Sequence, residues 1–293
     1  RWLFQAIDPT AWPCSRPIYS LPSSPSFRST ATPKRWRPQA FPRSGWARSG
    51  MSAVSSSGGI RVVQQFFRLL PCTRHGYKNA MQRIETLDHI ATGLDALCGM
   101  DPRLEKVRSM AGDVPLRLSE PGFRSLASII VSQQVSRASA DAIFGRFTAL
   151  LDPLTPQAVL AAGEQLFREA GLSRPKQKGL IAVAQAVEDG LDLHHLCTLD
   201  ATDALGLLTA VPGIGPWTAE CYLLFAAGHP DIFPARDVAL QSAVGHALDI
   251  SPRPGEKALI KLAESWSPWR GVASRLFWSY YRETRGRDAA PPV

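Results

Sequence analysis

A short glycine-rich turn between two helix-forming stretches constrains the fold of this chain more than any other feature. Residues 211–220 have the sequence Val-Pro-Gly-Ile-Gly-Pro-Trp-Thr-Ala-Glu. Because Gly213 and Gly215 lack a Cβ, the backbone can turn sharply there and another backbone can approach it closely. Pro212 disfavours helix before the turn, and Pro216 suits the first position of a helix after it. The pattern predicts a helix, a tight hairpin and a second helix.

The sequences on both sides of the hairpin support this interpretation. Upstream, Leu205, Leu208 and Val211 recur every three residues and predict a helix over residues 200–210; downstream, residues 217–227 are an apolar helical run. The second helix begins with free N–H groups and the positive end of its dipole, which attract an anion such as a phosphate. An ordinary turn closed by glycines has the same local pattern, so the hairpin alone leaves both interpretations open.

Helix start and stop signals continue from Met81 onward. Thr86 is expected to cap a helix that ends near Gly99, Thr155 precedes a proline at a helix start, and a helix that opens at Ser173 is closed by a glycine. Further helices are expected near residues 122–134, 137–150, 216–228, 238–248, 255–265 and 269–285, and the one strand-like run is 114–118. The pattern predicts an all-α protein of about 210 ordered residues, enough for one core or two small lobes.

The charge of the chain is divided unevenly along the sequence. Residues 1–80 hold 12 of the 33 Lys and Arg and one acidic residue, a net charge of +11, whereas residues 81–293 hold 21 basic and 24 acidic residues, a net charge of −3. Bulk charge is therefore no argument for nucleic-acid binding by the second part. Any basic footprint must be local, although a solvated face is the default interpretation of such clusters. The candidates are Arg270, Arg275, Arg282, Arg285 and Arg287, and Arg174, Lys176 and Lys178.

The first 80 residues differ from the rest in composition. They are rich in Pro, Ser and Arg and show no sustained period, so we expect a disordered extension. We favour a non-functional extension such as translated upstream sequence; a transit peptide and a DNA-binding tail remain open. The chain has no apolar run of transmembrane length, and its five cysteines show no paired spacing that would indicate a zinc site or a disulfide framework.

The hairpin and the aspartate that follows it, Asp237 in Phe-Pro-Ala-Arg-Asp-Val-Ala-Leu, together resemble the helix-hairpin-helix (HhH-GPD) DNA glycosylase superfamily, most closely its DNA-3-methyladenine glycosylase II branch. The resemblance extends over roughly residues 81–287. It is carried also by Ser125-Leu-Ala-Ser-Ile-Ile-Val-Ser-Gln-Gln-Val-Ser136, by residues 171–178, by residues 266–270 and by residues 275–278. It implies that residues 81–293 form one glycosylase domain, in which two helical lobes enclose a cleft and the N- and C-terminal segments together build one lobe.

The resemblance implies a catalytic role for Asp237. Cleavage of an N-glycosidic bond develops positive charge on the deoxyribose, which a fixed carboxylate can stabilise while it orients or deprotonates a water. An aspartate before an apolar helix is also a common N-cap, and the two roles are compatible. A helix N-terminus would help to keep the carboxylate ionised. One carboxylate can suffice, because an alkylated leaving base already carries positive charge.

The resemblance also implies base contacts by Trp217, Trp278, Cys221 and Tyr222. Bifunctional relatives have a lysine at the position of Trp217, which forms a Schiff base, so this chain is expected to hydrolyse without lyase chemistry. An indole can stack on a flipped cationic base, a contact worth on the order of 1–2 kcal/mol. Core packing is the alternative role of either tryptophan. The longer-known branch has a tyrosine where this chain has Cys221, with Tyr222 one position on.

The remaining contacts that the resemblance implies are with DNA and with a cation. Gln133 and Gln134 lie where the family inserts a side chain into the duplex, although two glutamines also suit a solvated helix end. The hairpin is expected to bind DNA through Gly213, Ile214, Gly215 and Thr218. A monovalent cation at the carbonyls of Thr209, Val211 and Ile214 is the one metal considered, and no cofactor is expected.

The resemblance, together with these residues, implies an enzyme that flips alkylated purines, chiefly 3-methyladenine and also 7-methylguanine, out of duplex DNA and hydrolyses the glycosidic bond. The expected partner is double-stranded DNA with alkylated bases, the expected state is a monomer away from membranes, and the expected location is the cytoplasm, or an organelle or nucleus if residues 1–80 are a targeting segment. Two alternatives remain: a monofunctional glycosylase with another damaged-base specificity, and a non-catalytic helix-hairpin-helix DNA-binding module.

Overall fold

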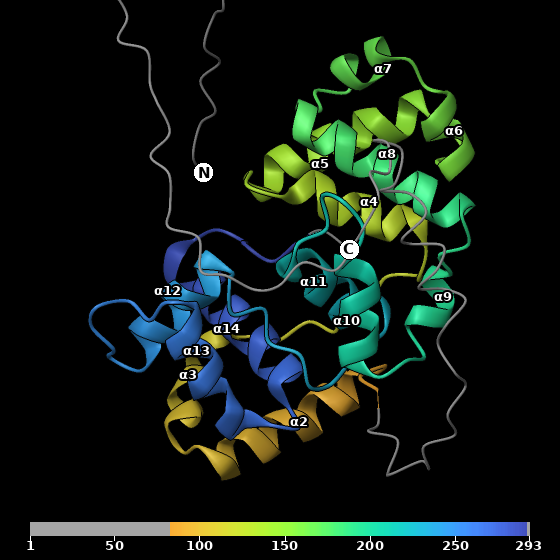
Figure 1. Cartoon of the computed structure of the whole chain (residues 1–293). Coiled ribbons are helices and arrows are strands. Elements are labelled where there is room, and N and C mark those ends of the chain that lie inside the picture. Colours follow the sequence, from red (N-terminus) through yellow and green to blue (C-terminus); the bar gives the residue numbers. More distant parts are fainter. Residues whose placement is uncertain (1–82, 292–293) are drawn as a thin grey trace, which may run out of the picture. The chain divides into compact units, whose positions relative to one another are not determined.

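The computed structural model describes residues 83–291, and the disorder expected of residues 1–80 lies outside this range. The described residues form helices and connecting segments, with no strand among them, so the predicted all-α fold class is confirmed (Figure 1). The helices are α2 (Leu87–Met100), α3 (Arg103–Ala111), α4 (Phe123–Ser132), α5 (Arg137–Leu150), α6 (Pro156–Ala161), α7 (Glu164–Glu169), α8 (Arg174–Glu188), α9 (Leu193–Leu196), α10 (Ala201–Thr209), α11 (Pro216–Ala226), α12 (Val238–Ala247), α13 (Glu256–Ala263), the 3₁₀ turn η1 (Glu264–Trp266) and α14 (Arg270–Arg285).

Most helix starts follow from local capping. The Thr86 side chain accepts a hydrogen bond from the N–H of His89 at the start of α2, and the Thr155 side chain accepts one from the N–H of Ala158 at the start of α6. Ser173 is the extended residue before α8, although its side chain makes no capping bond. The structure also contains α3, α7 and α9, which the sequence analysis did not delimit.

The expectation of a strand-like run at residues 114–118 is wrong. The segment between α3 and α4 bonds to residues of α14 and α11 and not to another extended segment, so it has no ladder partner. The carbonyl of Leu116 accepts a hydrogen bond from Nε of Arg275, and the N–H of Ser119 donates to the carbonyl of Phe225. The segment therefore connects two helices without forming a sheet.

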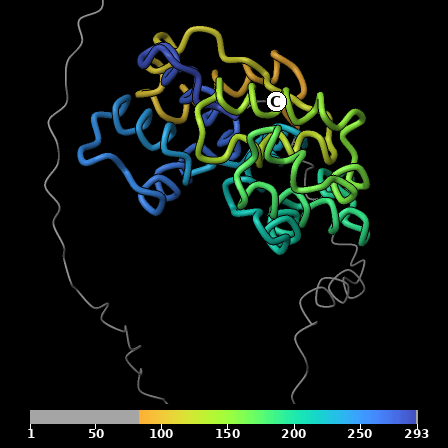
Figure 2. The backbone as a smooth tube through the Cα atoms, turned by 90° about the horizontal axis from the view of Figure 1, so that it is seen from above, coloured from red at the N-terminus to blue at the C-terminus, as the bar shows by residue number. Residues whose placement is uncertain are grey.

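The helices pack in two groups that correspond to the two expected lobes. In one group, α14 packs against α2, α3, α12 and η1, and α13 packs against η1. In the other, α4 packs against α5, α8 and α11, α6 packs against α8, and α10 packs against α11. Figure 2 shows the first described helices, α2 and α3, beside α14, the last helix. The first group thus combines segments from both ends of the described chain, as the resemblance implies.

Helix α14 lies at the centre of the first group and buries a charged residue. Arg275 is 1% exposed, and its guanidinium donates hydrogen bonds to the carbonyls of Leu116, Gly271 and Leu224. Arg275 therefore has no surface on which to meet DNA, which removes it from the candidate footprint. None of the described helices is long and apolar enough to span a membrane.

Candidate active site

The hairpin between α10 and α11 forms as the glycine pattern predicts. Gly213 has a φ of +90°, and the N–H of Ile214 donates to the carbonyl of Val211 over 3.1 Å. A Cβ on Gly213 would lie 2.8 Å from the Cα of Gly179 in α8. The tip of the hairpin therefore packs backbone to backbone on α8, and a larger residue would force the two apart. Gly215 then provides the extended residue before Pro216 begins α11.

Asp237 is the N-cap of α12, and three N–H donors converge on its carboxylate. Oδ1 accepts from the backbone N–H of Leu240 at 2.9 Å and from the indole Nε1–H of Trp278 at 3.4 Å, and Oδ2 accepts from the indole Nε1–H of Trp217 at 3.0 Å. Asp237 is 8% exposed. The capping role is confirmed, and the same bonds hold the carboxylate in a single orientation between two tryptophans.

The electrostatic setting of Asp237 is dominated by burial. Burial raises the pKa of Asp237 above its usual range, and the hydrogen bonds from Leu240, Trp217 and Trp278 offset part of that rise. The expectation that the helix N-terminus would keep this group ionised is therefore only partly met, because loss of water outweighs the donors. These three donors are neutral, so no positive charge is bonded to the carboxylate.

The carboxylate opens into a cleft of about 600 Å³ that lies beside the hairpin. The structure brings most of the expected site residues to this cleft. It is lined by Asp237, Trp217 and Thr218, by Gly213 and Gly215 of the hairpin, by Gln133 and Gln134, and by Ser132, Val135, Arg236, Val238, Ala239 and Ala289. Ile214 is 4% exposed, packs into the core and is not among the residues that line the cleft.

The two glutamines have different positions in the turn after α4. Nε2 of Gln133 donates to Oγ1 of Thr218 over 2.9 Å, which ties this turn to helix α11. Gln134 has a φ of +58° and an exposed side chain at the tip of the turn. Lys176 stabilises the start of this turn, because its buried Nζ donates to the carbonyl of Val131 at the end of α4. Lys176 is therefore not free to contact DNA, unlike the expectation for its cluster.

Three of the residues expected to contact a base lie outside the lining of this cleft. Trp278 is 2% exposed, reaches the cleft only through its bond to Asp237, and packs on Phe225 with ring centroids 5.6 Å apart. Cys221 and Tyr222 are fully buried, and the Tyr222 hydroxyl accepts from the N–H of Gly122 and donates to the carbonyl of Leu193. The structure therefore corrects the sequence expectation for Cys221 and Tyr222, because α11 enters the core after its first turn.

Six residues of the cleft wall were not among the sequence candidates: Ser132, Val135, Arg236, Val238, Ala239 and Ala289. Val135 follows the exposed turn and is 39% exposed, and Ala289 comes from the segment after α14. An apolar residue directly after the glutamine pair was the available signal for Val135; Ala289 lies in a segment without periodicity and had none. The cation expected at the carbonyls of Thr209, Val211 and Ile214 stays a prediction.

The chain is similar in sequence and fold to known base excision DNA repair proteins. The family model for HhH-GPD superfamily base excision DNA repair proteins matches residues 127–268. DNA-3-methyladenine glycosylase 1 of Schizosaccharomyces pombe is 26% identical over 223 residues, which cover 72% of this chain and 96% of that protein.

Two solved structures share the fold. The Schizosaccharomyces pombe 3-methyladenine DNA glycosylase in complex with abasic DNA has a TM-score of 0.60 at 25% identity and covers 65% of this chain and 95% of its own. The DNA-3-methyladenine glycosidase of Bacillus halodurans has a TM-score of 0.57 at 33% identity, over 64% of this chain and 88% of that one. The hairpin and Asp237 lie in one cleft. Together with these matches, this shows that the chain belongs to the HhH-GPD superfamily of base excision DNA repair proteins.

Proposed function

We propose that this protein is a DNA glycosylase that removes alkylated purines, chiefly 3-methyladenine and also 7-methylguanine, from duplex DNA by hydrolysis. The observation that carries the proposal is the carboxylate of Asp237, held by Trp217 and Trp278 in a cleft that also contains the hairpin. Two relatives that this chain matches over most of their own length are named DNA-3-methyladenine glycosylase and DNA-3-methyladenine glycosidase. The abasic DNA bound to one of them is the product that such a reaction leaves.

The chemistry follows from the charge that the reaction develops. Breaking the bond between a purine and C1′ of the sugar leaves positive charge on the sugar ring. Asp237 is bonded to neutral donors, so its negative charge remains available to stabilise that cation and to polarise a water on its way to C1′. Burial strengthens the interaction because little water screens it. The leaving purine needs no second acid when alkylation has already made it cationic.

A hydrolytic reaction is favoured over a lyase reaction by the residue after the hairpin. Trp217 has no amine, so it cannot form the imine that a lysine at this position would form with the sugar. Its Nε1–H is fixed on Asp237, which holds the indole in one orientation while the ring lines the cleft. An electron-rich ring at this place suits a cationic base better than a neutral one.

The hairpin and the turn after α4 are suited to hold DNA on either side of the extruded nucleotide. The hairpin presents the N-terminus of α11, whose free N–H groups attract a phosphate. Gln134 is exposed at the tip of its turn, which suits a side chain that fills the space left by an extruded nucleotide. Both elements line the cleft that contains Asp237.

Release of free base from methylated duplex DNA tests the proposal. We expect the wild-type protein to release 3-methyladenine and to leave alkali-labile abasic sites, without a covalent complex when borohydride is added. A covalent complex trapped by borohydride would contradict the hydrolytic mechanism. If no base is released while the protein still binds duplex DNA, the chain is a DNA-binding module and the proposed activity is wrong.

A further inference from the structure

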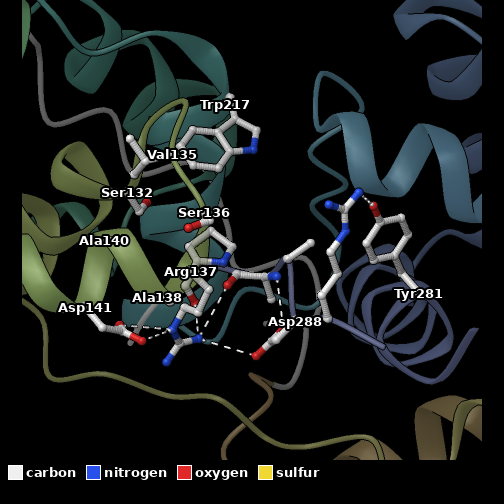
Figure 3. A pocket seen from close by; sticks show the side chains of 14 residues that line it. Ser132, Val135, Ser136, Arg137, Ala138, Ala140, Asp141, Trp217, Tyr281 and Asp288 are labelled. Atoms are coloured by element: carbon white, nitrogen blue, oxygen red, sulfur yellow. Dashed lines mark hydrogen bonds and ion pairs between the residues drawn. The ribbon is translucent and has the colours of Figure 1, made fainter. Parts of the chain in front are cut away.

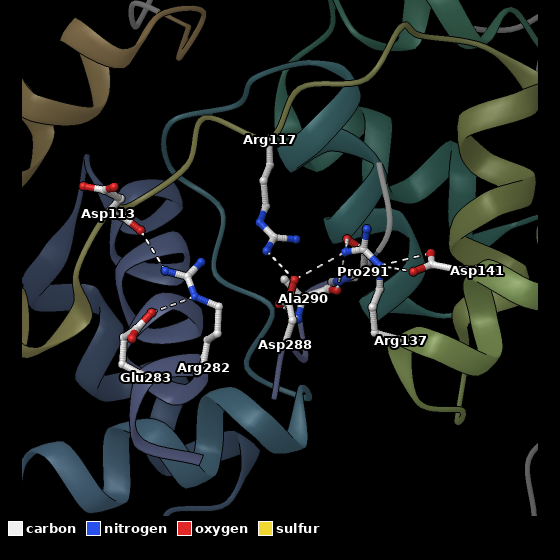
Figure 4. A network of polar contacts seen from close by, with 9 residues as sticks. All are labelled: Asp113, Arg117, Arg137, Asp141, Arg282, Glu283, Asp288, Ala290 and Pro291. Atoms are coloured by element: carbon white, nitrogen blue, oxygen red, sulfur yellow. Dashed lines mark hydrogen bonds and ion pairs between the residues drawn. The ribbon is translucent and has the colours of Figure 1, made fainter. Parts of the chain in front are cut away.

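The segment after α14 crosses from one helical group to the other. Gly286 ends α14 in a left-handed conformation, with a φ of +64°. The residues that follow, 287–291, which we term the C-terminal strap, run to the start of α5 (Figure 4). Ala290 in the strap is 1% exposed. The strap is therefore packed into the molecule and does not lie free on its surface.

One aspartate fastens the strap at both sides. Oδ2 of Asp288 lies 2.6 Å from Nη2 of Arg117 and 3.5 Å from Nη1 of Arg137, and Oδ1 accepts from the N–H of Ala290 (Figure 4). Although burial raises the pKa of Asp288, the hydrogen bond and charge of Arg117 outweigh it and hold the pKa below its usual range. Arg137 also donates to the carbonyls of Ala290 and Pro291. These contacts fix the strap to α5 and to the segment before α4.

Arg117 adopts a conformation that is costly for a residue with a side chain. Its φ is +47°, in the left-handed region that favours glycine. Such a conformation persists where surrounding contacts hold it. The guanidinium that this backbone presents is largely buried, and its ion pair with Asp288 is 2.6 Å long. This short ion pair ties the strap, through Asp288, to the segment before α4.

The strap closes a second cavity, which adjoins the cleft at Asp237. This cavity has a volume of about 500 Å³ and is lined by Trp217, Tyr281, the start of α5 and the strap (Figure 3). Four residues line both the cavity and the cleft: Ser132, Val135, Trp217 and Ala289. The two hollows are thus neighbouring compartments, and Ala289 is the strap residue that they share.

We propose that the C-terminal strap is a wall of the compartment that receives the extruded base, and that Ala289 limits the size of the alkyl group that the compartment admits. This inference rests on the proposed function. If Asp237 acts at C1′, the attached purine must extend from the cleft past Trp217, which faces both compartments. Alanine has the smallest side chain that has a Cβ, so a larger residue at 289 takes volume from the base.

A methyl-versus-ethyl comparison tests the size limit. Methylated duplex DNA and ethylated duplex DNA are mixed in one reaction. The released 3-methyladenine and 3-ethyladenine are then separated and quantified. One methylene changes discrimination about tenfold or more when a pocket wall opposes it. We expect Ala289→Leu to lower the ratio of ethyl to methyl product by about that factor. The affinity of the Ala289→Leu variant for DNA with an abasic site is expected to stay unchanged, because that DNA has no base at this position to contact residue 289.

A second pair of variants tests the fastening of the strap. Asp288→Asn removes the charge that holds the strap to Arg117, so a second-site Asp288→Asn in the Ala289→Leu protein is expected to recover most of the lost ethyl release. Asp95→Asn is the matched control, because Asp95 forms an ion pair of the same 2.6 Å length with Arg108 outside both compartments. Added to Ala289→Leu, it is expected to recover none.

Each result has a defined meaning. An active wild type with an ethyl-to-methyl ratio that Ala289→Leu leaves unchanged would overturn the inference about the strap and leave the proposed function standing. A parallel loss of both products and of abasic-DNA affinity would also overturn it, because the strap would then serve the fold or the DNA backbone. A wild type that releases neither base would overturn the proposed function and this inference together.

Discussion

Asp237 and Asp288 line the two neighbouring compartments of this molecule, and they are held in opposite ways. Asp237 accepts hydrogen bonds from two indoles and a backbone N–H, and burial raises its pKa. Asp288 lies between Arg117 and Arg137; burial raises its pKa as well, but the arginine contacts hold it below the usual range. One carboxylate is stabilised by neutral dipoles and the other by cations.

The difference indicates which carboxylate can act on a substrate. The charge of Asp288 is already balanced by arginines, so a further cation gains little from it, and its role is to hold the strap. The charge of Asp237 is bonded only to neutral donors, so a cation that forms beside it is stabilised strongly in a site with little water. The same arrangement costs folding stability, because a buried charge without a counter-charge is unfavourable.

The largest effect is expected from Asp237→Asn. Asparagine retains a side-chain oxygen that can cap α12 but has no negative charge, so single-turnover release of 7-methylguanine is expected to fall by about 100-fold or more. Filter binding to abasic DNA is expected to stay within a factor of about two, because the hairpin is unchanged. Equal release by the wild type and the variant would remove Asp237 from the mechanism.

Trp217→Phe is expected to have the next largest effect. The variant retains an aromatic ring but loses the N–H that donates to Oδ2 of Asp237, and a hydrogen bond to a charged group is worth about 1.5–3 kcal/mol, or roughly 10- to 100-fold in rate. The control is Trp266→Phe, which removes an indole bond to Asp101 away from the cleft. Similar losses of release in both variants would indicate a general effect on the fold.

Arg117→Met tests Asp288, the carboxylate that is stabilised by cations. Of its two arginine contacts Asp288 would retain only the longer one, with Arg137, so the free energy of unfolding in urea at pH 7 is expected to fall by about 1–2 kcal/mol. The wild type gains this stability above the unfolded-state pKa of an aspartate and loses it as the pH falls through the lowered pKa of Asp288. A difference between the two proteins that persists unchanged in strong acid would contradict the ion-pair account.

The smallest effect is expected in the way that the ionisation of Asp237 makes the stability of the fold depend on pH. Its folded-state pKa is raised, so the native state binds the proton more tightly than the unfolded state, and the wild type loses stability as the pH rises from the unfolded value of 3.8 through the raised pKa. Asp237→Asn has no such titration. The midpoint temperature of the variant relative to the wild type should therefore increase with pH across this window, and a constant difference would contradict the raised pKa.

The sequence predicted those parts of the molecule whose signals are local. The hairpin depends on Gly213 and its flanking prolines, and the capping role of Asp237 depends on its place before an apolar helix. Cys221 and Tyr222 were misplaced because the apolar residues of α11 are spread around the helix, so the sequence pattern did not tell which face meets the cleft. The structure places both in the core.

The strap could not be predicted because its position depends on distant residues. Asp288 meets Arg117 across 171 positions of the chain, and Arg137 meets Ala290 across 153. No periodicity or capping pattern marks such contacts. The short range of sequence signals therefore explains why Asp237 was identified as a candidate and Ala289 was not.

The proposed mechanism requires that Asp237 act as a carboxylate, and the indole of Trp217 is one of the donors that stabilise its charge against burial. The most direct test is single-turnover release of 7-methylguanine as a function of pH below 7, where the leaving base is cationic, by the wild type and by Trp217→Phe. The account predicts a rate that falls toward acid with a midpoint above 3.8, and a midpoint that moves to still higher pH in the variant. A rate independent of pH, or the same midpoint in both proteins, would contradict it.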